Sequence, residues 1–145
     1  MNVALGFGCD RGTPLATLQF ALDAALAQAG AQMADVAKAA SITLKSDELG
    51  LLALAHSHGW PLAFYSPAQL SEVTVPNPSE TVRRFTGTAS VSEAAALLAG
   101  ASNLGLDKAL PPSALLVEKF KYRGADGRNA TVSIARCDSS FFNQS

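Results

Sequence analysis

The sequence is poor in charged residues, and its positive and negative charges almost cancel. Asp, Glu, Lys and Arg make up 16% of the 145 residues, and the net charge at pH 7 is −1. Soluble domains usually carry about 25% charged residues, and domains that bind nucleic acid are usually clearly basic. We therefore expect no nucleic-acid partner.

Long apolar runs and cysteines are also scarce. No stretch reaches the roughly 18 apolar residues that a membrane span requires, and the first residues lack the basic segment of a secretory signal. We therefore expect a cytoplasmic protein without a membrane partner. The two cysteines, Cys9 and Cys137, and the two histidines, His56 and His58, lack the spacing of a zinc site. We expect neither a metal nor a cofactor.

Short apolar segments do occur, and they alternate with segments of helical periodicity. The pattern predicts strands over 3–8, 41–44, 60–65, 115–122 and 130–136, and helices over 13–30, 33–40, 46–59, 66–70, 79–87 and 90–100. This alternation is typical of an α/β protein. We expect one domain over 1–145, a three-layer α/β/α sandwich. Its sheet should be mixed and mainly parallel, with about five strands and a C-terminal β-hairpin.

A glycine-rich turn follows the first expected strand and leads into a helix. Backbone N–H groups at such a turn, together with the helix dipole, favour anions, and Arg11 adds a guanidinium suited to carboxylates or phosphates. The turn lacks the Gly-Lys-Ser/Thr of a Walker loop and the glycine spacing of a dinucleotide fingerprint. It is either an anion site or an ordinary tight βα turn. Its candidate ligand-binding residues are Gly6, Gly8, Cys9, Arg11 and Gly12.

Cys9 stands beside two of these glycines. A thiol near a helix N-terminus can act as a nucleophile, but no partner base is identifiable for it. We favour a small packed residue, and we assign no catalytic residue.

Polar residues elsewhere form three further candidate groups for ligand binding. Ligands gather at the carboxyl ends of parallel strands, and the first of these groups follows the end of the second expected strand. Each group also has a structural interpretation, as helix caps or as solvated strand positions. The groups are Lys45, Asp47 and Glu48 after the second strand, Asn77 and Ser79 in a Pro-rich loop, and Lys119 and Lys121 on one face of a later strand.

Six motifs in order resemble the cobalamin-biosynthesis family that contains CobE and the C-terminal domain of CbiG. They are Gly-Phe-Gly-Cys-Asp-Arg-Gly at 6–12, Leu-Lys-Ser-Asp-Glu at 44–48, Pro-Asn-Pro-Ser-Glu at 76–80, Ser-Val-Ser-Glu-Ala-Ala-Ala at 90–96, Lys-Phe-Lys at 119–121 and Thr-Val-Ser-Ile-Ala-Arg at 131–136. The resemblance covers nearly the whole chain, at the length of the stand-alone CobE form. Asp10 departs from it, because family members often carry a second basic residue there.

The resemblance implies a protein of the oxygen-dependent route to vitamin B12. We expect an auxiliary or carrier protein that binds a precorrin or corrinoid intermediate, with other cobalamin-biosynthesis enzymes as candidate partners. The alternative implied by CbiG is a hydrolase that opens a precorrin ring-A lactone and releases acetaldehyde. A third interpretation is a protein that only assembles the enzymes of the pathway. Carboxylates of such a ligand would meet Arg11, Lys45, Lys119 and Lys121, and an apolar groove would bury its ring.

Overall fold

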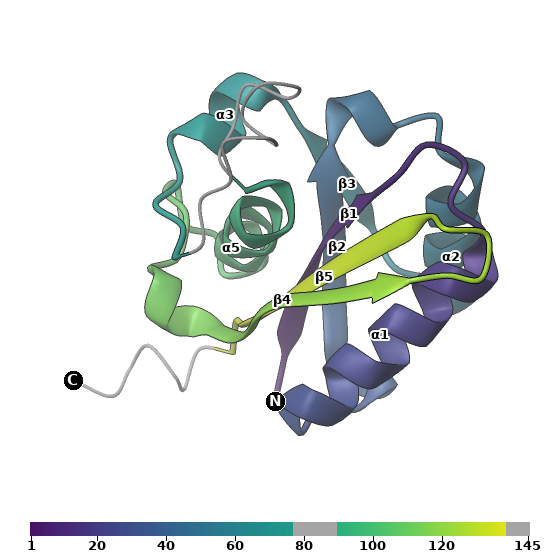
Figure 1. Ribbon diagram of the computed structural model, residues 1–145. Helices are drawn as coiled ribbons and strands as arrows, with labels where there is room; N and C mark the ends of the chain where they lie inside the picture. Colours follow the sequence, from purple (N-terminus) through teal and green to yellow (C-terminus); the bar gives the residue numbers. More distant parts are fainter. Residues whose placement is uncertain (77–89, 139–145) are drawn as a thin grey trace.

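The computed structural model describes residues 1–76 and 90–138 (Figure 1). The strands are β1 (Val3–Cys9), β2 (Val36–Ile42), β3 (Leu62–Tyr65), β4 (Leu115–Arg123) and β5 (Asn129–Arg136). The α-helices are α1 (Leu15–Ala29), α2 (Leu49–His58), α3 (Pro67–Ser71) and α5 (Val91–Asn103), and short 3₁₀ turns cover Met33–Asp35, Thr43–Lys45 and Pro112–Ala114. The helix expected over 79–87 lies outside the described residues.

The strands form one mixed sheet of five strands, in the order β3-β2-β1-β5-β4. β1 pairs in parallel with β2, and β2 pairs in parallel with β3. β5 runs antiparallel to both β1 and β4. The predicted five-strand mixed sheet and C-terminal hairpin are therefore confirmed, but the sheet is only partly parallel, because β5 is inserted antiparallel beside the central strand.

Helices pack on both faces of this sheet. In Figure 1, α1 and α2 lie on one side of the strands, and α5 and α3 lie on the other. A first apolar cluster joins α1 and α2 to the sheet through buried side chains such as Phe7, Leu22 and Leu51. A second cluster joins α5 and α3 to the opposite face, and alanines of α5 supply much of it. Alternation along each strand explains how neighbouring residues serve opposite clusters.

The expected helix over 33–40 is wrong. Only Met33–Asp35 forms a 3₁₀ turn, and β2 already begins at Val36. The alanines of this segment favour a helix in isolation. Pairing with β1 on one side and β3 on the other overrides that preference, because a central strand is hydrogen-bonded along both edges. The expected strand over 41–44 is correspondingly displaced, and Thr43–Lys45 forms a 3₁₀ turn.

The N-cap residues of α2 and α5 make no capping hydrogen bond through their side chains. Helix α2 has Glu48 as its N-cap residue, not Ser46 or Asp47. Ser90 is the N-cap residue of α5, but its side chain makes no capping hydrogen bond, so it forms no capping box with Glu93.

Helix α5 lies very close to the middle of β1. A Cβ atom on Gly6 would stand 1.8 Å from the carbonyl oxygen of Ser92 and 2.6 Å from the backbone nitrogen of Ala96. Farther along the helix, Gly100 packs beside Cys137, whose N–H donates to the carbonyl of Asn2. The helix therefore runs antiparallel to β1, and its N-terminus points toward the carboxyl end of that strand.

Candidate functional site

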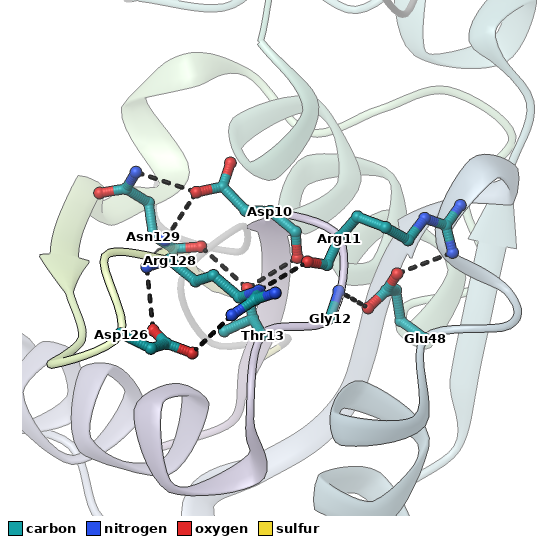
Figure 2. A network of polar contacts seen from close by, with 8 residues as sticks. All are labelled: Asp10, Arg11, Gly12, Thr13, Glu48, Asp126, Arg128 and Asn129. Atoms are coloured by element: carbon teal, nitrogen blue, oxygen red, sulfur yellow. Dashed lines mark hydrogen bonds and ion pairs between the residues drawn. The ribbon is translucent and has the colours of Figure 1, made fainter.

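The glycine-rich turn at the end of β1 is held by the loop of the β4–β5 hairpin (Figure 2). The Asp10 carboxylate accepts hydrogen bonds from the backbone N–H of Asn129 at 2.7 Å and from its side-chain amide at 3.0 Å. Arg128 Nε donates to the carbonyl oxygen of Arg11 at 3.0 Å. Asp10, where the family resemblance leads us to expect a basic residue, thus attaches the turn to β5.

Arg11 is held by the segment that precedes α2. Its Nη1 lies 2.6 Å from Asp47 Oδ1 and 2.7 Å from Glu48 Oε2, and its Nη2 donates to the carbonyl oxygen of Leu44 at 2.9 Å. The hydrogen bond with Arg11, together with the attraction of its charge, holds the pKa of the exposed Asp47 carboxyl below its ordinary value. The expected free cation of the turn is therefore already paired with two carboxylates.

The carboxylate of Glu48 lies against the glycine-rich turn and binds its backbone. Its Oε1 accepts the backbone N–H of Gly12 at 2.8 Å, and only 4% of its side chain is exposed. Gly12 adopts a positive φ of 79°, a conformation that glycine reaches without strain. Within the described residues, the backbone N–H of Gly12 at this turn is bound by a carboxylate side chain of the same protein (Figure 2).

Cys9 has the surroundings of a packed thiol. Burial raises the pKa of the Cys9 thiol, and the positive charge of Lys45 opposes this effect only in part. A nucleophilic cysteine needs the opposite shift, because the thiolate is the reactive form. This environment agrees with the interpretation of Cys9 as a small packed residue.

Lysines flank the carboxyl end of β1. Lys45 is close enough to Cys9 to affect its pKa. On the other side, Lys121 is in register with Thr131, which is in register with Gly8. Within residues 1–76 and 90–138, neither Lys45 nor Lys121 forms an ion pair. Asn77 and Ser79 lie outside the described residues.

Lys119 lies where the pairing of β4 with β5 is irregular, between Val117 and Phe120. Burial lowers the pKa of the Lys119 ammonium group, the carboxylate of Glu93 opposes this effect, and the charge of Lys121 adds to it. Lys119 therefore lies near both Lys121 and the first turn of α5. Bulges of this kind often redirect a side chain beside a functional site.

Two buried hydroxyl groups join α5 to the β4–β5 hairpin beside Glu118, the residue before Lys119. The oxygens of Ser92 and Ser133 are 2.9 Å apart, and Ser133 also donates to the carbonyl oxygen of Glu118. Because a carbonyl can only accept, the single proton of Ser133 goes to Glu118, and Ser92 donates to Ser133. These bonds fix the N-terminal turn of α5 over β5 and β4.

A family model described as "Cobalamin synthesis G C-terminus" matches residues 3–135. The chain belongs to this family.

Proteins similar to this chain are named for steps or proteins of cobalamin biosynthesis. The chain is 41% identical over 107 residues to "Cobalt-precorrin-5A hydrolase" of Priestia megaterium, covering 73% of this chain and 29% of that protein. It is 38% identical over 99 residues to "Protein CobE" of Sinorhizobium sp, covering 67% and 64%. A crystal structure of CobE, from the cobalamin (vitamin B12) biosynthetic pathway, matches with a TM-score of 0.76 and 31% identity, covering 94% of this chain and 92% of that one. The chain thus spans less than two thirds of both curated relatives.

The sequence predicts the glycine-rich turn but not its supports on the hairpin. Asn129, Arg128 and Asp126 form the network under the turn, where Arg128 also pairs with Asp126 at 3.1 Å. The Asp-Gly pair at 126–127 indicates a turn, but nothing local places that turn beside β1. Their role follows only from the position of β5 next to β1.

Over 1–76 and 90–138, no three residues of the types His, Cys, Asp and Glu come together as a metal site. In the same ranges, no helix has the length and apolar character needed to cross a membrane.

Proposed function

We propose that the protein binds a precorrin or corrinoid intermediate of the oxygen-dependent cobalamin route, as an auxiliary or carrier protein. The ligand lies at the carboxyl end of β1, and the observation that carries this proposal is the pair of lysines on either side of it. Lys45 and Lys121 form no ion pair within the described ranges, so both ammonium groups are available to carboxylates. Precorrins and corrinoids carry many carboxylates around a large apolar ring, and charge-assisted hydrogen bonds suit them.

Arg11 has a different role in this proposal from the one expected from the sequence. Because it is paired with Asp47 and Glu48, it shapes the rim and leaves ligand carboxylates to the lysines. Gly8, where an added Cβ would lie 3.8 Å from Thr131, allows the backbone to lie close to the ligand.

Hydrolysis of a precorrin lactone is the second candidate function. It is favoured by the name of the Priestia megaterium relative, at 41% identity. Against it, the Cys9 thiol has a raised pKa, and the carboxylates of Asp47 and Glu48 are held by Arg11. A general base needs a free carboxylate or imidazole within reach of its proton. Binding without turnover is therefore the favoured function.

An absorbance titration with hydrogenobyrinic acid, a metal-free corrinoid, tests the proposal. The parent protein should give a saturable spectral shift, and Lys45→Met should weaken binding by about tenfold, as expected for the loss of one charged hydrogen bond. Lys108→Met serves as the control, because exposed Lys108 follows the opposite end of α5. Absence of any shift with folded parent protein would refute corrinoid binding.

A parallel incubation with cobalt-precorrin-5A, followed by an assay for acetaldehyde, distinguishes the two functions. Stoichiometric binding without acetaldehyde supports the carrier role. Release of acetaldehyde in repeated turnovers would replace it with the hydrolase.

A further inference from the structure

Exposed leucines lie where α1 and α2 begin, beside the carboxyl ends of β1 and β2. Leu15 is the exposed first residue of α1, and Leu49, the first residue of α2, is 81% exposed. Leu44 is 49% exposed and lies in the 3₁₀ turn that follows β2. A single exposed leucine is ordinary, whereas adjacent exposed leucines with polar residues around them are typical of a binding surface.

Backbone contacts bring these three leucines together around the glycine-rich turn. Arg11 Nη2 donates to the carbonyl oxygen of Leu44 at 2.9 Å. Two consecutive turns shorten the segment between Leu44 and Leu49. A Cβ atom on Gly50, the residue after Leu49, would stand 3.2 Å from the backbone nitrogen of Leu15, so the first turns of α1 and α2 are in contact. We call Leu15, Leu44 and Leu49 the leucine platform.

An available positive charge adjoins the leucine platform. Lys45 follows Leu44 in the same 3₁₀ turn, and it forms no ion pair within residues 1–76 and 90–138. Its charge acts on Cys9, the last residue of β1, so this turn lies beside the carboxyl end of that strand. Apolar surface and an ammonium group therefore stand side by side, which complements a ligand that has an apolar ring with carboxylates around it.

The size and position of the leucine platform favour a small molecule over a protein partner. Each partner in a stable protein complex buries roughly 800 Å² of surface, which is more than three partly exposed leucines provide. The starts of the helices that follow parallel strands are also where α/β proteins bind small ligands.

We propose that the apolar ring of the bound intermediate lies on the leucine platform, with its carboxylates reaching Lys45. This inference depends on the proposed function, and it adds the surface that orients the ring. The leucines exclude water from one face of the ring, so their contribution to affinity is independent of screening by salt. The contribution of Lys45 is electrostatic, so salt weakens it.

Absorbance titrations with hydrogenobyrinic acid compare the parent protein with Leu44→Ser and Leu49→Ser. Each variant should bind about tenfold more weakly, as expected when a leucine that the ligand buries becomes polar. This loss should be the same at about 0.05 M and about 0.5 M salt, whereas the loss in Lys45→Met should shrink at the higher concentration. Leu106→Ser should bind as the parent does, because Leu106 is 50% exposed, close to the value for Leu44, but follows the C-terminal end of α5.

Thermal unfolding checks that each variant is folded, and Leu49→Ser should keep its Tm within about 2 °C of the parent because this side chain is mostly in solvent. If the parent binds hydrogenobyrinic acid and both folded variants bind it within twofold of the parent, the leucine platform is refuted and corrinoid binding stands. If sedimentation shows a dimeric parent and a monomeric Leu49→Ser, these leucines join two copies of the chain and the platform is likewise refuted. If the folded parent does not bind, the platform and the proposed function are both refuted.

Discussion

Removal of the Glu48 side chain tests whether the glycine-rich turn is an anion site filled by the protein itself. Glu48 accepts the N–H of Gly12 at 2.8 Å and lies 2.7 Å from Arg11 Nη1, with 4% of its side chain exposed. Hydrogen bonds to a charged group contribute about 1.5 to 3 kcal/mol. We expect Glu48→Ala to lower the free energy of unfolding by about 2 to 3 kcal/mol, since part of the loss is recovered by water reaching the turn.

Urea and thermal unfolding measure this effect. For a domain of this size each kcal/mol corresponds to about 2 to 4 °C, so the Tm should fall by about 5 to 10 °C. Asp47→Ala is the matched control, because Asp47 contacts the same guanidinium but its side chain is 75% exposed. Exposed ion pairs contribute little, so this variant should change the Tm by no more than about 2 °C.

Added formate provides a second readout. Glu48→Ala leaves the Gly12 N–H and Arg11 around a vacated carboxylate position, which formate can enter. Formate should raise the Tm of Glu48→Ala by more than it raises that of the parent, by mass action. Equal losses of stability in the Glu48 and Asp47 variants, or no difference in the response to formate, would refute this account of the turn.

Two further predictions concern packing and pH. Gly6→Ala should lower the free energy of unfolding by about 3 kcal/mol, because its Cβ would meet rigid backbone at 1.8 Å. Gly8→Ala should lower it by less than about 1 kcal/mol. Urea titrations of both variants measure these losses, and equal losses would contradict the prediction. Burial raises the pKa of the Cys137 thiol from 9.0 to about 11. As the pH rises, the unfolded chain therefore loses this proton before the folded protein does. The free energy of unfolding should fall by about 2 to 3 kcal/mol as the pH rises from about 9 to about 11. Urea unfolding from pH 8 to pH 11 should show this loss in the parent beyond any loss in Cys137→Ala, and parallel curves would count against it.

Local signals in the sequence were sufficient for much of the fold. The apolar run of β1, the glycines that end α1 and α2, and the hairpin at 115–136 all follow from short-range chemistry. The helix predicted over 33–40 was wrong because alanine occurs in both helices and strands. Pairing with β1 and β3 favours the strand in this segment.

The candidate site was only partly predictable, for a different reason. Glu48 reaches Gly12 across 36 residues, and Asn129 reaches Asp10 across 119. Such contacts depend on strand order, which no local pattern encodes. Ser90 illustrates the same limit, because its sequence context indicates a capping box, and only the packing of α5 leaves its hydroxyl without a partner.

The antiparallel insertion of β5 beside β1 has a consequence for how the protein is made. β1 can pair with β2 as soon as both have left the ribosome, but its other edge has no partner until β5 emerges, long after β1. Until then the nascent chain carries an unpaired central strand, which is an aggregation hazard. Folding should therefore be slow to complete and should depend on protection of that edge during translation, because its decisive contacts are far apart in sequence.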